Sequence, residues 1–287
     1  MICPEAAADA LRQSAVRSGT LPSSRAGDYW LLGQFFWGAR RLGQRSTRGE
    51  LMTVLLLLHA FPFDARMWEG QEPVFEEAGY EVIAPSLPGR DAADPTLSSW
   101  AARVLDLLPG DFIPVGVSMG GYLAFELWRQ APKRIPALVL ADTRATADDE
   151  AGRAARDETI RLLRENGFDP FWAGLAPKLF AAEASPDTIA RAHEIAAEQP
   201  VESLVASVEA MRDRFDSTTT LADIEVPALV LVGEEDAVTP PLAAKEIVTG
   251  LVEGRYAEIA GAGHLSPLER PAEFNEEVLV FLHEVLA

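Results

Sequence analysis

Short apolar runs alternate with helical patterns along most of the chain. The apolar runs lie at 54–58, 80–84, 112–117, 137–141, 228–232 and 256–259. A continuous apolar run of this length is typical of a parallel strand that is covered on both faces. Between the runs, apolar positions recur every three or four residues, which predicts helices near 73–78, 98–108, 241–251 and 272–285 and from Met119 onward. This alternation predicts an α/β fold with a doubly wound, mostly parallel sheet.

The alternation is interrupted once, between residues 143 and 222. This stretch contains no strand-like run, and its helical patterns lie at about 148–166, 170–182, 186–199 and 201–215. The last pattern is expected to bury Leu204, Val208, Met211 and Phe215, which are spaced by 4, 3 and 4. We therefore expect an all-helical cap at 143–222, inserted into a core made of 52–142 and 223–287.

Residues 1–51 differ in composition from the rest of the chain. They hold seven arginines and four acidic residues, a balance of +3 within a chain of net charge −19. The segment shows little sustained periodicity, and a strong strand pattern begins only after Met52. The segment is expected to be an N-terminal appendage, disordered or translated from upstream of the real start. The alternative is a leading β-hairpin formed around residues 29–37.

Charge and cysteine content narrow the class of partner. A net charge of −19 disfavours nucleic acid and anionic membranes as partners. The single cysteine, Cys3, cannot form an internal disulfide, which fits a reducing compartment. The longest apolar stretches, 30–37 and 51–61, fall short of the ~20 residues of a membrane span, and no secretory signal pattern opens the chain. We expect a cytoplasmic protein that acts on a small molecule; the oligomeric state stays open.

A G-x-S-x-G motif lies between a predicted strand and a predicted helix. Ser118 is flanked by Gly116 and Gly120, and the helix after it carries Leu123 and Leu127 on one stripe. Glycines let the backbone turn sharply from strand to helix, and the turn exposes the serine hydroxyl at the helix N-terminus. This context predicts a nucleophile elbow, which needs an acid and then a histidine later in the chain.

His264 is the candidate general base for this serine. It lies in a glycine-rich loop, Gly261-Ala262-Gly263-His264, between the last predicted strand and the last predicted helix. The other histidines are His59, His193 and His283, and none follows an acid at the end of a later strand. A base in this position would accept the serine proton and return it to the leaving group.

Two aspartates compete for the role of the acid that orients the histidine. Asp236 directly follows the strand at 228–232, at the sheet edge where sites collect. Asp142 ends the preceding strand in a similar position. We favour Asp236 because it gives the chain order Ser…Asp…His. Its neighbours Glu234 and Glu235 are expected to be solvated loop residues.

The loop after the first strong strand is the candidate oxyanion loop. Backbone N–H groups of Phe61 and Met119 are expected to hold a developing oxyanion, because Pro62 has no N–H to donate. His59 is expected to be a buried histidine that hydrogen-bonds the loop. The candidates for pocket lining are His59, Trp68, Phe171 and Trp172, although core packing explains these side chains equally well. No cysteine–histidine cluster and no nucleotide-binding glycine motif occurs, so neither a metal nor a cofactor is expected.

From Met52 onward the chain resembles the α/β-hydrolase superfamily. The resemblance rests on His59-Ala60-Phe61-Pro62, the elbow at Ser118, and the loops that end at Asp236 and His264. The chain is most similar to small capped bacterial carboxylesterases and 3-oxoadipate enol-lactonase-like hydrolases. It departs from them at Ala60, where glycine is common, and at Val117, where histidine is frequent; both positions touch the pocket.

The resemblance and the motifs imply the same reaction. We expect a serine hydrolase that cleaves a small carboxylic ester or lactone through an acyl-enzyme, with Ser118, His264 and Asp236 as its triad. A carbon–carbon bond hydrolase of the same fold is one alternative. Others are a ligand-binding module with slow turnover and a protein that binds partners through its acidic surface.

Overall fold

Six parallel strands form the centre of the molecule. The computed structural model describes residues 53–87, 95–108 and 110–287. The strands are β1 (Val54–Leu58), β2 (Glu81–Ile83), β3 (Phe112–Val117), β4 (Leu138–Ala141), β5 (Ala228–Gly233) and β6 (Gly254–Ile259). They pair in the order β2-β1-β3-β4-β5-β6, and every pairing is parallel. The predicted α/β fold with a mostly parallel sheet is confirmed.

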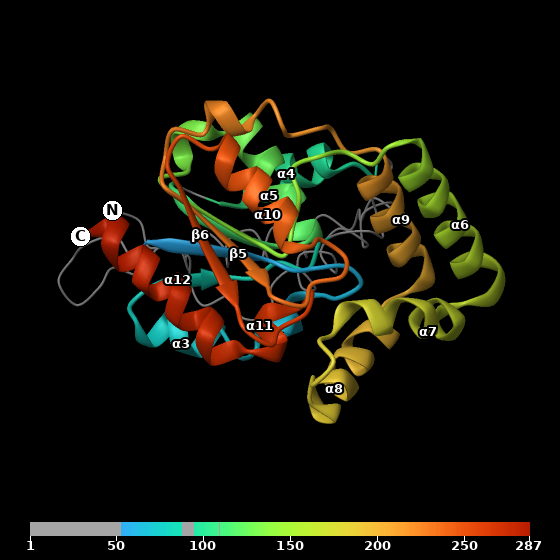
Figure 1. The fold of residues 1–287 in the computed structure, drawn as a ribbon. Helices are drawn as coiled ribbons and strands as arrows, with labels where there is room; N and C mark the ends of the chain where they lie inside the picture. Colours follow the sequence, from blue (N-terminus) through green and yellow to red (C-terminus); the bar gives the residue numbers. More distant parts are fainter. Residues whose placement is uncertain (1–52, 88–94, 109) are drawn as a thin grey trace, which may run out of the picture. The chain divides into compact units, whose positions relative to one another are not determined.

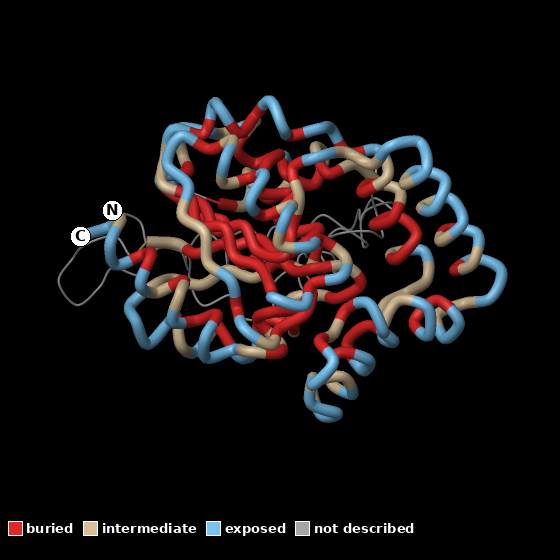
Figure 2. The backbone as a smooth tube through the Cα atoms, viewed as in Figure 1, coloured by how far each residue is buried: buried red, intermediate tan, exposed pale blue. Residues whose placement is uncertain are grey.

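Helices cover both faces of this sheet (Figure 1). One face carries α4 (Leu97–Leu107), α5 (Met119–Gln130) and α10 (Pro241–Gly250). The other carries α3 (Glu72–Glu77) and α12 (Pro271–Leu286). Figure 2 shows the strands as the most buried part of the chain, as expected for a sheet that is covered twice.

Alternate side chains of each strand serve two separate cores. Leu56 and Leu58 of β1 pack in the cluster that includes α4 and α5. Leu55 and Leu57 pack in the cluster that includes α3 and α12. All four leucines are fully buried, and burying one leucine side chain stabilises a fold by roughly 1.5–3 kcal/mol. The continuous apolar runs in the sequence follow from this double burial.

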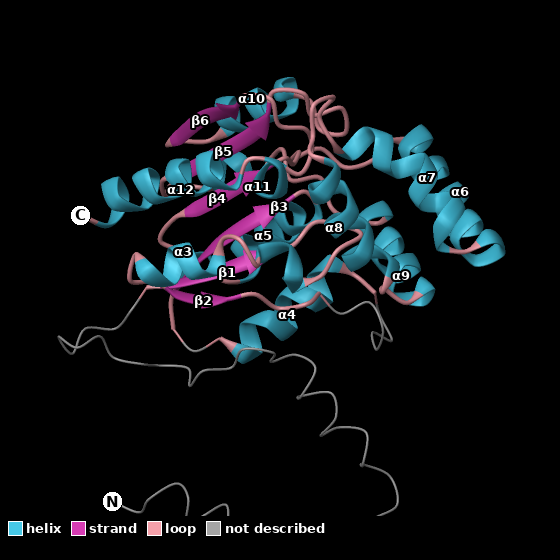
Figure 3. Cartoon of the chain, turned by 90° about the horizontal axis from the view of Figure 1, so that it is seen from below, coloured by secondary structure: helices cyan, strands magenta, loops and turns pink. Residues whose placement is uncertain are grey.

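Four helices are inserted between β4 and β5, as the helical patterns predicted. They are α6 (Glu150–Asn166), α7 (Phe168–Leu179), α8 (Pro186–Ala197) and α9 (Val201–Arg212). Asp149 caps α6 by accepting from the N–H of Gly152 at 2.8 Å, and Ser185 caps α8 by accepting from that of Thr188 at 3.0 Å. In Figure 3 the strand arrows point towards the side on which α6–α9 lie. The insertion therefore lies at the carboxyl edge of the sheet.

The expected burial of Phe215 is wrong. Helix α9 ends at Arg212, so the stripe of Leu204, Val208 and Met211 is buried, but Phe215 is 66% exposed. Beyond the helix the chain turns so that Arg214 points inward. Its guanidinium donates to the carbonyls of Met211 at 2.7 Å and Thr146 at 2.8 Å, and to the carboxylate of Asp148 at 2.9 Å. Burying this arginine leaves the phenylalanine outside.

Several expectations concern residues or boundaries that the fold does not decide. The expected appendage at 1–51 lies outside the described residues, as does the alternative hairpin. The boundaries of the core and the cap at 142/143 and 222/223 stay predictions. Among the described helices, none combines the length and the apolar character needed to cross a membrane.

Candidate active site

Ser118 sits in a strained turn between β3 and α5. Its backbone has φ of 54° and ψ of −112°, a region that non-glycine residues rarely adopt. Its N–H donates to the carbonyl of Ala141 at 2.9 Å, and its carbonyl accepts from the hydroxyl of Thr143, also at 2.9 Å. Hydrogen bonds to the last residue of β4 and to Thr143, two residues beyond it, thus hold the turn in a conformation that the serine alone would not favour.

The flanking glycines are required by close backbone contacts. A Cβ atom on Gly116 would lie 2.4 Å from the carbonyl oxygen of Gly120. A Cβ atom on Gly120 would lie 2.0 Å from the carbonyl oxygen of Leu58 in β1. No side chain fits at either position without moving the strand or the helix. The motif in the sequence therefore reflects how tightly α5 begins against the sheet.

A row of hydrogen bonds connects Ser118, His264 and Asp236. The Nε2 atom of His264 lies 2.9 Å from Oγ of Ser118. The Nδ1 atom of the same ring lies 2.9 Å from Oδ2 and 3.0 Å from Oδ1 of Asp236. An ionised carboxylate only accepts, so Nδ1 carries the proton and Nε2 is free to accept from the serine hydroxyl. All three residues are buried.

Asp236 is held as a carboxylate by its neighbours. Its Oδ1 accepts from the N–H groups of Val238 and Thr239, each at 2.8 Å, and its Oδ2 accepts from the Thr239 hydroxyl at 2.7 Å. Burial opposes ionisation, but the hydrogen bonds from His264 and Thr239 outweigh it and lower the pKa of Asp236. The carboxylate is thus fixed in charge and in orientation beside the imidazole.

Asp142 is also buried near this row, but its hydrogen bonds go elsewhere. Its Oδ1 accepts from the N–H of Gly233 at 2.9 Å. Its Oδ2 accepts from Ser266, from the N–H at 3.1 Å and from the hydroxyl at 2.6 Å. Burial, and then the neighbouring charge of Asp236, raise the pKa of Asp142 to about 7. The structure therefore places Asp236, and not its rival, against the ring of His264.

The loop after β1 carries two further candidate groups, the N–H of Phe61 and the ring of His59, and α5 begins with a third, the N–H of Met119. Within the described residues, neither the N–H of Phe61 nor that of Met119 donates to a protein acceptor. The ring of His59 is buried; its Nδ1 lies 2.9 Å from the Ala60 carbonyl, and its Nε2 accepts from the N–H of Leu87 at 2.8 Å. These two bonds define a neutral ring, and burial lowers the pKa of His59 accordingly. Its role in the loop is to connect backbone segments.

Aromatic side chains of α7 cover the same loop. The ring of Phe171 meets that of Phe61 edge-on at a centroid distance of 5.6 Å. The ring of Trp172 meets that of Phe63 edge-on at 6.5 Å. Trp68, in contrast, is fully buried and its ring lies 6.1 Å from Phe274 of α12. Of the candidate lining residues, the two from α7 lie over the loop after β1, and Trp68 packs in the core.

Glu269 is a residue at the site that the sequence did not bring forward. Its Oε1 accepts from the N–H groups of Gly263 at 2.9 Å and Leu265 at 3.3 Å, on either side of His264. Its Oε2 accepts from the N–H of Ala181, just after α7, at 2.7 Å. Burial raises the pKa of Glu269. Glu269 ends the four-residue helix α11 (Ser266–Glu269), directly after the histidine loop. Its residue type alone gives no signal in the sequence, because its partners are backbone groups.

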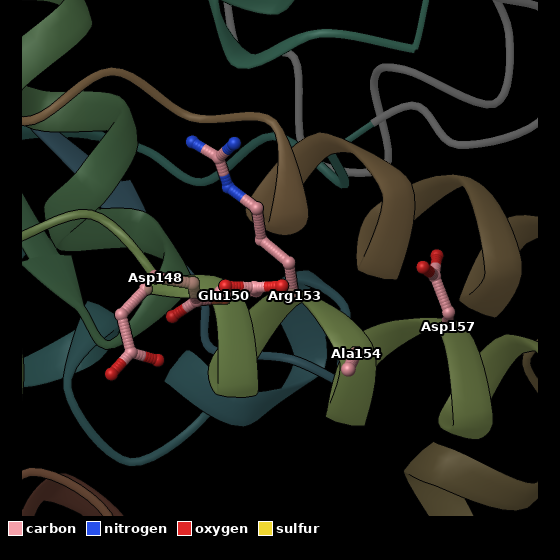
Figure 4. Close-up of a pocket in the computed structure, with 6 residues that line it drawn as sticks. Asp148, Glu150, Arg153, Ala154 and Asp157 are labelled. Atoms are coloured by element: carbon pink, nitrogen blue, oxygen red, sulfur yellow. The ribbon is translucent and has the colours of Figure 1, made fainter.

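A separate pocket lies at the start of α6 (Figure 4). Its lining consists of Ala154 and the charged side chains Asp148, Asp149, Glu150, Arg153 and Asp157, and it includes none of Ser118, Asp236 and His264. Asp148 is already paired with Arg214 at 2.9 Å. In the part of the chain that the structure describes, no group of three or more His, Cys, Asp or Glu residues is arranged to hold a metal ion.

The elbow, the hydrogen-bonded row and the covered parallel sheet define a class of protein. The model of the alpha/beta hydrolase family matches residues 55–277, and the chain belongs to this family.

The proteins to which the chain is similar include esterases and a lactonase. The chain is similar to a pimeloyl-[acyl-carrier protein] methyl ester esterase of Aromatoleum aromaticum, with 29% identity over 81% of this chain and 97% of the relative. It is 26% identical to 3-oxoadipate enol-lactonase 2 of Acinetobacter baylyi, over 78% of this chain and 86% of that one. The solved structure of a thermophilic esterase from Thermogutta terrifontis, with malate bound, has 30% identity and a TM-score of 0.75, covering 81% and 90% of the two chains.

Proposed function

We propose that the protein is a serine hydrolase that cleaves a small carboxylic ester or lactone through an acyl-enzyme. The observation that carries the proposal is the continuous row from Ser118 Oγ through His264 to Asp236, with 2.9 Å at each junction. A serine hydroxyl becomes nucleophilic when an adjacent base accepts its proton. In this proposal Ser118 is the nucleophile, His264 is the general base and Asp236 holds the imidazole.

The proposed first step forms a bond between Ser118 and the substrate carbonyl. As Oγ attacks the carbonyl carbon, its proton passes to Nε2 of His264, and Asp236 stabilises the resulting imidazolium. The carbonyl electron pair moves onto oxygen, where the N–H groups of Phe61 and Met119 donate to it. Collapse of this tetrahedral species expels the alkoxide, which takes the proton from Nε2.

The second step regenerates the enzyme by the same route. Water gives a proton to Nε2 of His264 and attacks the acyl carbon, and the Ser118 oxygen then leaves and recovers its proton. All proton transfers of the proposal run through one ring nitrogen, so the reaction needs no cofactor. We propose that Phe171 and Trp172, which lie over the oxyanion loop, line the substrate pocket as an apolar wall.

Relatives support an ester or lactone as the substrate class. An esterase and an enol-lactonase both align with most of the chain. Both reactions place an acyl carbon in front of a nucleophile and release an oxygen leaving group, which the proposed proton path through His264 would serve.

Parallel assays on three substrate types test the proposal. We expect turnover of p-nitrophenyl acetate or of an enol-lactone, and a loss of at least about 10⁴-fold in kcat for Ser118→Ala. Turnover of a vinylogous 1,5-diketone alone would favour the carbon–carbon hydrolase. A single acyl adduct without further turnover, measured by intact-protein mass spectrometry, would favour the ligand-binding module. Activity that survives Ser118→Ala would reject both hydrolase mechanisms.

A further inference from the structure

The turn after α7 is attached to both loops that carry the proposed base and acid. The N–H of His264 itself donates to the carbonyl of Leu179, the last residue of α7, at 2.9 Å. The N–H of Ala181 donates to Glu269 at 2.7 Å, and that of Ala182 donates to Glu235, next to Asp236, at 2.9 Å. Residues 179–182 therefore connect the helical insertion to the loops that carry His264 and Asp236.

Glu269 is the buried member of these attachments. One carboxylate oxygen accepts from both residues that flank His264, and the other accepts from the turn. Three backbone donors thus converge on a single side chain, whereas Glu235 is exposed to solvent. A buried carboxylate with several N–H partners is a stronger connection than an exposed one, because water does not compete for its bonds.

The contact between the loop and the turn is also sterically close. A Cβ atom added to Gly263 would lie 2.5 Å from the nitrogen of Ala181 and 2.7 Å from the carbonyl carbon of Phe180. The backbone of the histidine loop and that of the turn therefore touch at this glycine, beside the Glu269 carboxylate.

We propose that Glu269 is a positioning residue that couples α7 to His264. The inference rests on the proposed function, because it assigns His264 the role of the base. Helix α7 also carries Phe171 and Trp172, the proposed apolar wall. A substrate that moves these rings would displace the turn, and the carboxylate would transmit the displacement to the imidazole. Misplacement of a catalytic group by about 1 Å can cost about 100-fold in rate.

Glu269→Gln tests the coupling while keeping the shape of the side chain. An amide has one acceptor oxygen, so it can keep the bonds to the histidine loop or the bond to Ala181, but its NH₂ group opposes a donor at the other end. We expect kcat to fall about 10- to 100-fold with KM within about threefold. Glu276→Gln, on the exposed side of α12, removes the same charge and should leave both parameters unchanged.

A spectroscopic readout separates positioning from simple loss of stability. The Nδ1 proton of His264, between the ring and Asp236, gives a downfield ¹H NMR signal that reports the geometry of this bond. We expect the signal to shift or broaden in Glu269→Gln, at a temperature where circular dichroism shows the variant to be folded. Either result in the folded variant, an unchanged NMR signal or an unchanged kcat, would overturn the proposal.

Gly263→Ala disturbs the same contact between the histidine loop and the turn after α7, because its Cβ atom would meet the backbone of Phe180 and Ala181. We expect a loss in kcat similar to that of Glu269→Gln, and a double variant that is no worse than about threefold below the poorer single variant, because both changes break one coupling. Multiplicative losses would overturn the coupling. If the wild type turns over no ester, the proposed function fails, but the NMR signal still decides whether Glu269 positions the ring.

Discussion

Ser266, two residues beyond His264 in the chain, donates a 2.6 Å hydrogen bond from its hydroxyl to Asp142. The carboxyl of Asp142 is thereby directed at the start of α11, and its other oxygen at Gly233, three residues before Asp236. Two aspartates thus follow neighbouring strands. Asp236 contacts the imidazole of His264, and Asp142 connects Gly233 at the end of β5 to Ser266 at the start of α11. We infer different functions for them.

Asparagine substitutions should separate the two aspartates. Asp236→Asn removes the acceptor that fixes the tautomer of His264, and the equivalent change in another serine hydrolase costs about 10⁴-fold in kcat, so we expect a loss of about 10³- to 10⁴-fold. Asp142→Asn keeps an acceptor for Ser266 but turns its NH₂ group toward the N–H of Gly233, so we expect a smaller loss of about 10- to 100-fold. The measurement is kcat on the best ester for both variants. A larger loss in Asp142→Asn would mean that the acid is assigned to the wrong residue.

Covalent labelling should report the nucleophile directly. A fluorophosphonate reacts with serine hydroxyls whose proton is taken by a neighbouring base, so it should modify Ser118 and no other residue. His264→Ala should slow the labelling by at least about 10³-fold, while its thermal midpoint stays within a few degrees of the wild type. Peptide mapping by mass spectrometry checks the position, and a label on any other serine would contradict the assignment.

Asp142 should make stability depend on pH. In the unfolded chain this group loses its proton near its ordinary pKa of 3.8, whereas the folded protein holds the proton to about 7. Between these values the folded state binds more protons, so this group's contribution to the free energy of unfolding decreases as the pH rises and is constant above about 7. The stability difference between wild type and Asp142→Asn should fall by at least about 1 kcal/mol between pH 4 and 7. Urea midpoints across this range measure it, and a difference that rises with pH would refute the raised pKa.

Two glycine-to-alanine changes should have opposite signs. Gly120→Ala puts a Cβ atom 2.0 Å from a carbonyl oxygen of β1, and we expect it to lower the free energy of unfolding by about 3 kcal/mol or more. Gly174→Ala, on the exposed side of α7, meets no atom within 4 Å and should raise it by about 0.5–1 kcal/mol. Denaturant titration compares the two. Equal effects would show that the close approach at the elbow is not tight.

The sheet and the elbow were predictable because their signals are local. Each strand with both faces covered must be apolar at nearly every position, as Leu55–Leu58 are, and each glycine of the elbow is forced by a contact within a few residues or with the adjacent strand. The expected helix stripe ending at Phe215 failed for the opposite reason. Burial of Arg214 depends on Asp148 and Thr146, more than 60 residues away, and the helical spacing carries no trace of them.

Glu269 shows why part of the site escaped the sequence. Its partners are backbone N–H groups of Gly263, Leu265 and Ala181, and a backbone group leaves no mark in residue type. Glu235 was expected to be merely solvated and does lie at the surface, but it too accepts a backbone bond, from Ala182. The choice between Asp142 and Asp236 likewise depended on which strand end faces the ring, which chain order alone only favours.

The four inserted helices lie in sequence between Ala141, the end of β4, and Ala228, the start of β5. None of Ser118, Asp236 and His264 therefore belongs to them. The inserted helices can therefore change in sequence without changing any of these three residues. Related proteins with different helices at this position would differ in substrate specificity, provided that the turn at residues 179–182 keeps its backbone path.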